Sequence, residues 1–385
     1  DHSGTITGNL DLELQGTHTT TEDFMGTGNI RNLTLNGSGL NVDIGRTTTI
    51  AGDLTITQGT LHTNASSNFA LTVTGDILIA TAGTLTCNSS ALQCRGIDVA
   101  GSGTLTAPDG SGSFTITGAQ GGSTEGDAFD TESGTTFTHS SGTITFTGNT
   151  QPQIRNRSGE SFNNIIINTT GGTPIVETQR DIVIAGTLTI VEGTFRSYGT
   201  ARTITVTGDV SVEDGGTLGG GSANTANHSF GSLTIASGGT YSATSGTTTI
   251  TGVYSSPFAL NNSGTFTNND GTLLLNRAGN QEFLGTWTGS SALHHLTIDG
   301  DGGTKKIRAN MLIEGDLDVT ASDTFTTHGN TETITVNGDV TASGTLGATT
   351  QTGAYSFGSL TIASGGTYIA TSGTTTITSA SSNYA

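Results

Sequence analysis

The sequence predicts an all-β protein folded as a parallel β-solenoid of about 22 residues per coil. Short runs such as GDLTIT at 52–57 alternate apolar residues with Thr, which is typical of half-buried strands. Similar contexts recur at nearly equal steps along the chain, at Leu296, Leu317, Val340 and Leu360. Gly is abundant, at 59 of 385 residues, and Pro is scarce, at 4. This balance suits the fold, because tight corners need Gly and interior strands need every backbone N–H.

A longer repeat contains these coils. The string GSLTIASGGTYSATSGTTTIT at 231–251 returns at 358–378 with one change, from Ser242 to Ile369. The landmarks IRNLTL, FNNIII and LHHLTI begin at Ile30, Phe162 and Leu293, so their steps in the numbering are nearly equal (162 − 30 = 132 and 293 − 162 = 131). We therefore expect three tandem modules and about eighteen coils in one continuous rod. The expected parts are a junction at 1–29, a module at 30–140, a junction at 141–161, a module at 162–252, a junction at 253–292, a module at 293–379 and the start of another junction at 380–385.

Two other architectures fit the sequence less well. Disordered chains lack β-branched residues in regular alternation, which this chain has in abundance. A string of immunoglobulin-like sandwiches requires turn signals every 8–12 residues and buried core aromatics. Aromatic residues make up 5% of this chain, and its single Trp, Trp287, has no counterpart in the other copies. The solenoid is therefore the preferred prediction.

The charge balance argues against two classes of partner. The formal net charge is −19, and the only Lys residues are Lys305 and Lys306. Phosphate binding needs clustered cations, so we expect no nucleic-acid partner. No run approaches the roughly 18 apolar residues that a membrane span requires, so we expect no membrane insertion of this segment.

The two cysteines, Cys87 and Cys94, have the same parity as Leu85 and Leu92 in their strands, so the alternation predicts that both point inward. We expect a disulfide between them, which would close a loop within one coil and suit an oxidising compartment. The alternative is a pair of small, buried, apolar residues.

Gly-Asp corners are the candidate metal sites. Asp53 and Asp76 are separated by one coil (76 − 53 = 23), as are Asp316 and Asp339 (339 − 316 = 23). This spacing places each pair at the same corner of adjacent coils, where stacked carboxylates could hold Ca²⁺. The alternative is that each Asp accepts hydrogen bonds from its own turn. The middle module has Thr187 at the first position, and no other cofactor is expected.

Asn-x-Ser/Thr triplets are candidate glycosylation sites in a secreted protein, since several should lie at exposed corners. Eight occur, beginning at Asn32, Asn36, Asn64, Asn88, Asn156, Asn168, Asn227 and Asn261.

The sequence does not predict an enzyme. Sites that cleave polysaccharides need paired carboxylates, or carboxylates with a cation that binds an acidic sugar. Here charges are thinly spread, and TKKIR at 304–308 is the only basic cluster. His294 and His295 are interpreted as polar residues at a strand start. An enzyme should gather carboxylates on one face within a few coils, whereas a structural shaft should show no such cluster.

Phrases such as GDLTI, LTVTGD and GTTTITG, spread over nearly the whole chain, resemble those of bacterial β-strand-repeat surface proteins, similar to haemagglutinin-type adhesins with parallel β-helical shafts. The resemblance implies a secreted, extracellular or cell-surface structural protein: the shaft of a fibre, filament or adhesin. The alternatives are a carbohydrate-active or carbohydrate-binding β-helix and, from the outward Thr rows, an ice-binding adhesin segment.

The partners expected for such a shaft are further repeats. The chain begins and ends at nearly the same phase of the repeat, so we expect its end coils to pair with flanking repeats of a longer chain or, end to end, with copies of itself. Host or surface glycans are the other expected partners.

Overall fold

The computed structural model confirms an all-β parallel solenoid. It describes residues 9–17, 19–20, 30–121, 126–171, 174–220 and 224–379. Within these ranges the only helical element is one 3-10 turn, η1 (Gly289–Ser291). The described residues form about 15 turns, fewer than the eighteen expected. No helix among them is long and apolar enough to cross a membrane.

The chain divides into two compact units rather than three modules. The first unit is 1–185 with 193–198, and the second is 186–192 with 199–385. The predicted module boundaries are therefore not confirmed and stay a prediction. Most of the expected junction at 1–29, and all of that at 380–385, lies outside the described residues.

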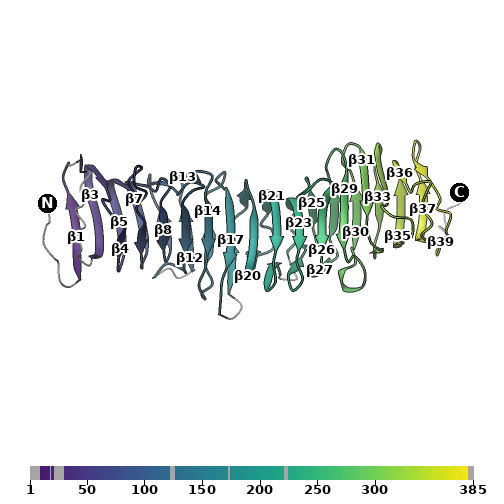
Figure 1. The fold of residues 1–385 in the computed structure, drawn as a ribbon, viewed down its shortest axis with the longest axis horizontal. Helices are drawn as coiled ribbons and strands as arrows, with labels where there is room; N and C mark the ends of the chain where they lie inside the picture. Colours follow the sequence, from purple (N-terminus) through teal and green to yellow (C-terminus); the bar gives the residue numbers. More distant parts are fainter. Residues whose placement is uncertain are drawn as a thin grey trace. The chain divides into compact units, whose positions relative to one another are not determined.

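The first unit stacks its strands side by side (Figure 1). They are β1 (Leu10–Gln15), β2 (Thr19–Thr20), β3 (Ile30–Asp43), β4 (Thr48–Ile50), β5 (Leu54–His62), β6 (Leu71–Val73), β7 (Ile77–Thr86), β8 (Ala91–Cys94), β9 (Ile97–Val99), β10 (Thr104–Thr106), β11 (Ser113–Ile116), β12 (Asp127–Thr131), β13 (Thr136–Thr138), β14 (Thr143–Phe146), β15 (Gln153–Arg155), β16 (Ser161–Phe162), β17 (Asn164–Asn168), β18 (Ile175–Thr178), β19 (Ile182–Ile184) and the second half of β20 (Leu188–Ser197).

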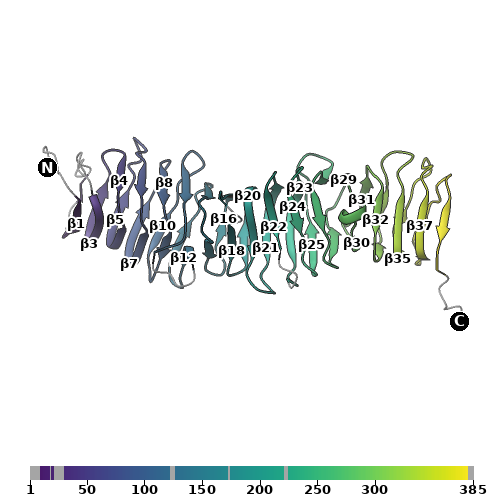
Figure 2. The same ribbon diagram turned by 90° about the horizontal axis from the view of Figure 1, so that it is seen from below.

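The second unit is built in the same way (Figure 2). It contains the first half of β20, then β21 (Ile204–Val212), β22 (Gly216–Gly219), β23 (His228–Ile235), β24 (Thr240–Ser242), β25 (Thr247–Ile250), β26 (Phe258–Asn262), β27 (Thr265–Thr267), β28 (Thr272–Leu275), β29 (Gln281–Gly285), β30 (His295–Ile298), β31 (Gly303–Ile307), β32 (Met311–Ile313), β33 (Leu317–Val319), β34 (Asp323–Thr327), β35 (Ile334–Ala342), β36 (Thr345–Leu346), β37 (Tyr355–Ile362), β38 (Thr367–Tyr368) and β39 (Thr375–Ile377).

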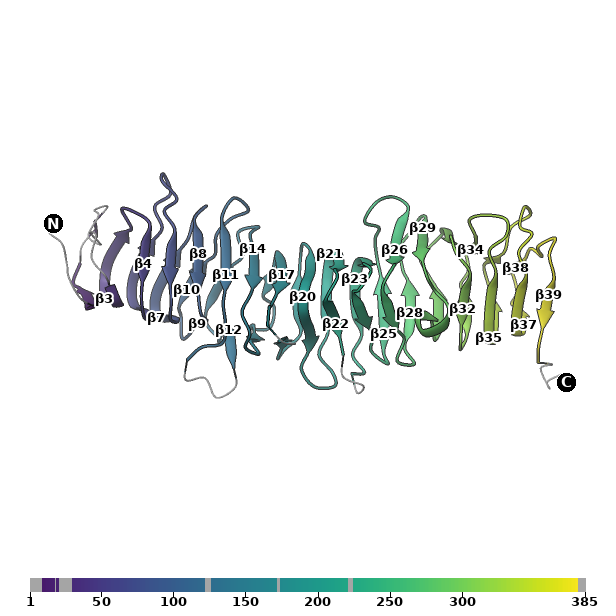
Figure 3. The same ribbon diagram turned by 60° about the horizontal axis from the view of Figure 1, so that its bottom comes forward.

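Each coil of the first unit contributes to three parallel ladders, parts of which can be followed in Figure 3. The first ladder runs through the first halves of β3, β5 and β7 and then β9, β12 and β15. The second ladder runs through the last residues of β3, β5 and β7 and then β10 and β13. The third ladder joins β4, β6, β8, β11, β14 and β17. Backbone hydrogen bonds therefore connect every coil to the next within this unit.

The core follows the predicted alternation. In β21 and β35, which are equivalent strands of two copies, the burial pattern is the same: Ile, Val, Val and the last residue are buried, and polar residues or Gly lie between them. The apolar residues of the landmarks are also buried, with Leu33, Ile165 and Leu296 all at 0% exposure. The alternation of the sequence thus gives the inward and outward faces directly.

The coils are not of one length. Ile77 pairs with Ile97, a step of 20 in the numbering, whereas Ile97 pairs with Phe129, a step of 32. The coil of about 22 residues expected from the sequence is therefore not confirmed. The longer coil has more residues between its paired strands, and coils of this kind leave room for fewer turns than expected.

Candidate functional sites at the corners and on the coil faces

The Gly-Asp corners of the first unit stack as the spacing predicted. The Asp76 backbone N–H donates to Asp53 Oδ1 at 2.9 Å, and the Asp53 N–H donates to Asn32 Oδ1 at 2.9 Å. Arg95 then closes the column, donating from Nε to Asp76 Oδ1 at 2.9 Å. Each polar side chain therefore binds the backbone of the next coil, and not its own turn as the alternative interpretation held.

The corresponding corner of the second unit repeats this arrangement. The Asp339 N–H donates to Asp316 Oδ1 at 2.8 Å, and the Asp316 N–H donates to His295 Nδ1 at 2.9 Å. The Ser359 hydroxyl donates to Asp339 Oδ1 at 2.6 Å. These carboxylates act as rungs between coils. Within the described residues no group of three or more His, Cys, Asp or Glu side chains could hold a metal ion, and Ca²⁺ binding stays a prediction.

The glycine of each corner has a steric cause. A Cβ on Gly75 would lie 2.1 Å from Asp53 Oδ1, and one on Gly338 would lie 2.4 Å from Asp316 Oδ1. Because the side chain from the coil before crosses this point, only Gly leaves room for it. The recurring Gly-Asp motif thus links adjacent coils: the Asp side chain bonds the next coil, and the Gly leaves room for the side chain from the coil before.

Two carboxylates lie next to each other on the first ladder, which the sequence analysis missed. Asp98 of β9 is the register partner of Asp130 of β12, so their Cα atoms are about 4.8 Å apart across the parallel pair. Both side chains face outward and are half-buried. The coil that joins them is longer than the sequence analysis expected, and this hid their proximity.

The surroundings of this acidic pair favour protonation. Burial, reinforced by Asp127 and Asp98, raises the pKa of Asp130 to about 7. Burial, reinforced by Glu132 and Asp127, also raises the pKa of Asp98. At neutral pH one carboxyl group of the pair therefore holds a proton for a substantial part of the time, which is the property of a general acid.

Gln120 and Gly121, which come before β12, make hydrogen bonds close to this pair. Gln120 donates from Nε2 to the Ile97 carbonyl at 3.0 Å, and the Gly121 N–H donates to Asp76 Oδ2 at 2.8 Å. Arg155 Nε lies 3.4 Å from Asp127 Oδ1. Carboxylates therefore do gather on one face within two coils, contrary to the thin spread of charge expected from the sequence.

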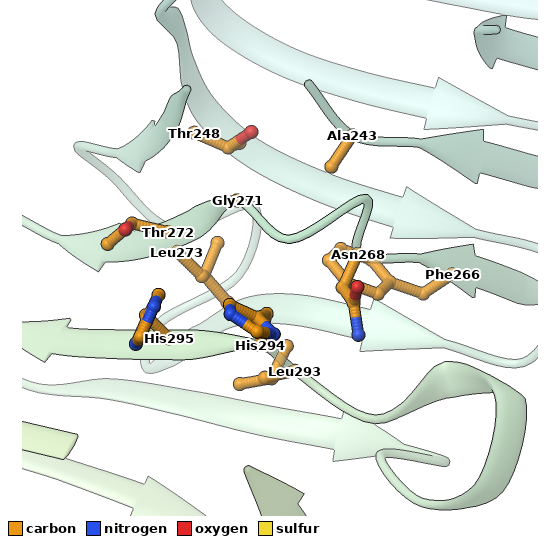
Figure 4. A pocket seen from close by; sticks show the side chains of 10 residues that line it. All are labelled: Ala243, Thr248, Phe266, Asn268, Gly271, Thr272, Leu273, Leu293, His294 and His295. Carbon is orange, nitrogen blue, oxygen red and sulfur yellow. The ribbon is translucent and has the colours of Figure 1, made fainter. Parts of the chain in front are cut away.

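His294 and His295 lie together at the rim of a small pocket in the second unit (Figure 4). Their ring centroids are 4.3 Å apart, and His294 Nδ1 lies 3.6 Å from Asp270 Oδ1. Since His295 Nδ1 accepts a backbone hydrogen bond, that ring is a structural acceptor at the corner. Phe266 and Leu293 form part of the apolar wall. His295 is the first residue of β30, as interpreted from the sequence.

One residue of the basic cluster at 304–308, Lys305, lies inside the solenoid, whereas Lys306 is half-buried and Arg308 is exposed. Lys305 and Asp323 are both buried, at 0% and 1% exposure. Lys305 Nζ donates to Asp323 Oδ1 at 3.0 Å and to the carbonyls of Arg277, Gly279 and Gly302 at 2.8–3.0 Å. Its ammonium group is fully occupied inside the solenoid and cannot bind an acidic sugar.

Cys87 and Cys94 point inward, as their parity predicted, and both are buried at 0% exposure. Both are free thiols in this structure, and the expected disulfide between them stays a prediction. Burial raises the pKa of both thiols, which keeps them protonated and unreactive. Their burial is compatible with both interpretations.

The candidate glycosylation sites differ in access. Asn156 is buried at 1% exposure and donates to the Asp181 carbonyl at 3.2 Å, so a glycan on it is incompatible with this fold. Asn64 and Asn88 lie at corners with positive φ, and Asn227 is exposed. The remaining four, which are half-buried or exposed residues of strands, are Asn32, Asn36, Asn168 and Asn261.

No protein-family model matches the chain, and no curated protein or solved structure is significantly similar to it.

Proposed function

We propose that this chain is the repetitive shaft of an extracellular surface fibre, filament or adhesin, and that its main action is mechanical, although the acidic pair Asp98 and Asp130 also favours the second candidate given below. Three features of the described residues support this proposal: parallel ladders between successive coils, side-chain rungs at the Gly-Asp corners, and a polar outward face rich in Thr. Backbone and side-chain bonds along the stack resist extension, and the net charge of −19 opposes lateral clumping.

The end-to-end part of this proposal is supported by a difference in exposure between equivalent Ile side chains of the two near-identical repeats. Ile235 and Ile250 are buried at 0% exposure beneath β26 and β28. Their counterparts Ile362 and Ile377 are 41% and 47% exposed. Among the described residues no coil covers Ile362 and Ile377, so they present an apolar face of the kind that β26 and β28 cover in the first repeat, and we propose that a second copy of the chain can cover it.

Electron microscopy of the purified chain tests the shaft. We expect particles joined at their ends into filaments, with an axial repeat near the length of one chain. Isolated particles with no end contacts at all concentrations would contradict end-to-end assembly.

A carbohydrate-active β-helix is the second candidate function, and the acidic pair Asp98 and Asp130 is the observation that favours it. In retaining glycosidases two carboxyl groups stand about 5–5.5 Å apart, one as acid and one as nucleophile. Here Asp130, with its pKa raised to about 7, would be the acid and Asp98 the nucleophile. Release of reducing ends from polysaccharides by the chain, abolished by Asp130→Asn, would support this function over a purely mechanical one.

A further inference from the structure

A polar cleft opens on the first unit where the second ladder begins. Its volume is about 410 Å³, within the range of about 300–1,000 Å³ that small-molecule sites occupy. The side chains that matter to the argument are Asn41 and Asp43 of β3, His62 of β5, and the corner residues Asn64 and Asn88.

The floor of this cleft departs from the pattern of the solenoid. Along one outward column of the second ladder, Thr86, Thr106 and Thr138 are register partners in successive coils. The two coils before them carry Asp43 and His62 at this position. An ionisable acceptor and an imidazole thus replace the usual Thr only where the cleft lies.

Three side chains of this floor have no bonding partner among the described residues. The side chains of Asp43, His62 and Asn88 make no hydrogen bond or ion pair with any described residue. Asp43 and His62 therefore differ from the corner carboxylates Asp53 and Asp316, which bind the next coil. They can accept and donate hydrogen bonds to a ligand in the cleft.

The wall of the cleft is held in place by the backbone. Asn64 adopts a φ of 56°, and its Oδ1 accepts from the Ser66 and Ser67 N–H groups at 3.1 and 3.0 Å. Asn88, one coil further on, has a φ of 47°. Both corners thus use Asn where Gly would be less strained, which brings carboxamides to the edge of the cleft.

We infer that this cleft binds a neutral saccharide, a function that goes beyond the proposed shaft and does not depend on end-to-end assembly. Sugar hydroxyls both donate and accept, and they match a floor of one carboxylate, one imidazole and flanking carboxamides. Among the described residues no Lys or Arg lines the cleft, and the chain carries a net charge of −19, so an acidic saccharide would be repelled.

Calorimetric titration of the full 385-residue chain tests this inference. The probes are hexasaccharides of glucose, mannose, xylose, galactose and N-acetylglucosamine, with hexagalacturonate as the acidic counterpart. We expect at least one neutral probe to bind and hexagalacturonate not to. Asp43→Ala and His62→Ala should each weaken the binding about tenfold to a hundredfold, since each removes a hydrogen-bonding partner.

Asp318→Ala is the matched control, because Asp318 is an exposed outward residue of β33 in the second unit and does not line the cleft. It should bind the neutral probe as the unaltered chain does, and far-ultraviolet circular dichroism should show that all three variants are folded. Absence of binding by every neutral probe, preference for hexagalacturonate, or equal affinity of the Asp43→Ala and Asp318→Ala variants would overturn the inference.

Discussion

Residues 231–251 and 358–378 are nearly the same sequence in two settings. Their internal contacts agree: the Tyr241 and Thr248 hydroxyls are 2.7 Å apart, as are those of Tyr368 and Thr375. Their contacts with the coil before also agree, because Thr251 and Thr378 each donate to a preceding Phe carbonyl at 3.2 Å. Among the described residues, the first repeat is covered by a following coil and the second is not. A coil thus specifies its own shape, whereas its burial depends on its neighbour.

The largest expected difference between the repeats is at their last Ile. Ile250→Ala should lower the free energy of unfolding by about 2–5 kcal/mol, because it leaves a cavity between coils. Ile377→Ala should change it by about 0.5 kcal/mol or less at low protein concentration, where that side chain is half in solvent. Urea denaturation of both variants measures the difference, and equal losses would mean that the two positions are equally covered.

The residue three positions before each repeat should give the two repeats different pH dependence. His228 occupies the place of Tyr355, and burial lowers the pKa of His228 to about 4, partly opposed by a backbone hydrogen bond at Arg202. The unfolded chain takes up this proton near pH 6.5 and the folded chain only near pH 4, so stability is full above pH 6.5 and is lost as the pH falls. The loss should reach about 3 kcal/mol at pH 4.

His228→Tyr, which copies the other repeat, is the control for this prediction. Thermal denaturation from pH 7.5 to pH 4 should show a smaller decline in melting temperature for this variant. Parallel declines for the variant and the unaltered chain would assign the acid sensitivity to other groups.

The first residue of each repeat should behave alike. A Cβ on Gly231 would lie 2.4 Å from the Thr207 carbonyl oxygen, and one on Gly358 would lie 2.4 Å from that of Asn337. Gly231→Ala and Gly358→Ala should therefore each lower stability by about 1–3 kcal/mol, since both clash with the preceding coil. If urea denaturation shows very different stability losses for the two variants, the two repeats do not contact the preceding coil in the same way.

The one sequence difference should have the smallest effect. Ser242 Oγ accepts a hydrogen bond from Asn269 Nδ2 at 2.9 Å. Ile369 is half-buried, and no further coil of the described residues covers it. Ser242→Ile should lose about 1 kcal/mol with that hydrogen bond, and Ile369→Ser less. Differential scanning fluorimetry can compare them; a severe loss in Ile369→Ser would show that this side chain is essential to its coil.

The sequence predicted the fold from local rules that the structure obeys. The parity of Cys87 and Leu85 gave their inward direction, and the one-coil spacing of Asp53 and Asp76 placed them at one corner. These inferences succeeded because alternation along a strand and coil-to-coil spacing are both written directly in the sequence.

The candidate sites could not be predicted in the same way. Asp98 and Asp130 are brought together by an unusually long coil, and Asp43 and His62 by a column that is otherwise Thr. The sequence showed Lys305 only as part of a basic cluster, and its inward direction in β31 was not predicted. In each case the outcome depends on corner length or on a partner distant in sequence, and the regular repeat does not contain that information.

Sedimentation velocity over a range of protein concentrations tests most directly whether the uncovered repeat seats a further coil. The chain should form species of two or more copies as concentration rises, and a double variant with Ile362→Lys and Ile377→Lys should stay a monomer. Val183 and Val191 are also exposed, at 39% and 37%, so a double variant with Lys at those positions is the control and should associate normally. A monomer at every concentration for the unaltered chain, or equal association of all three proteins, would contradict the account.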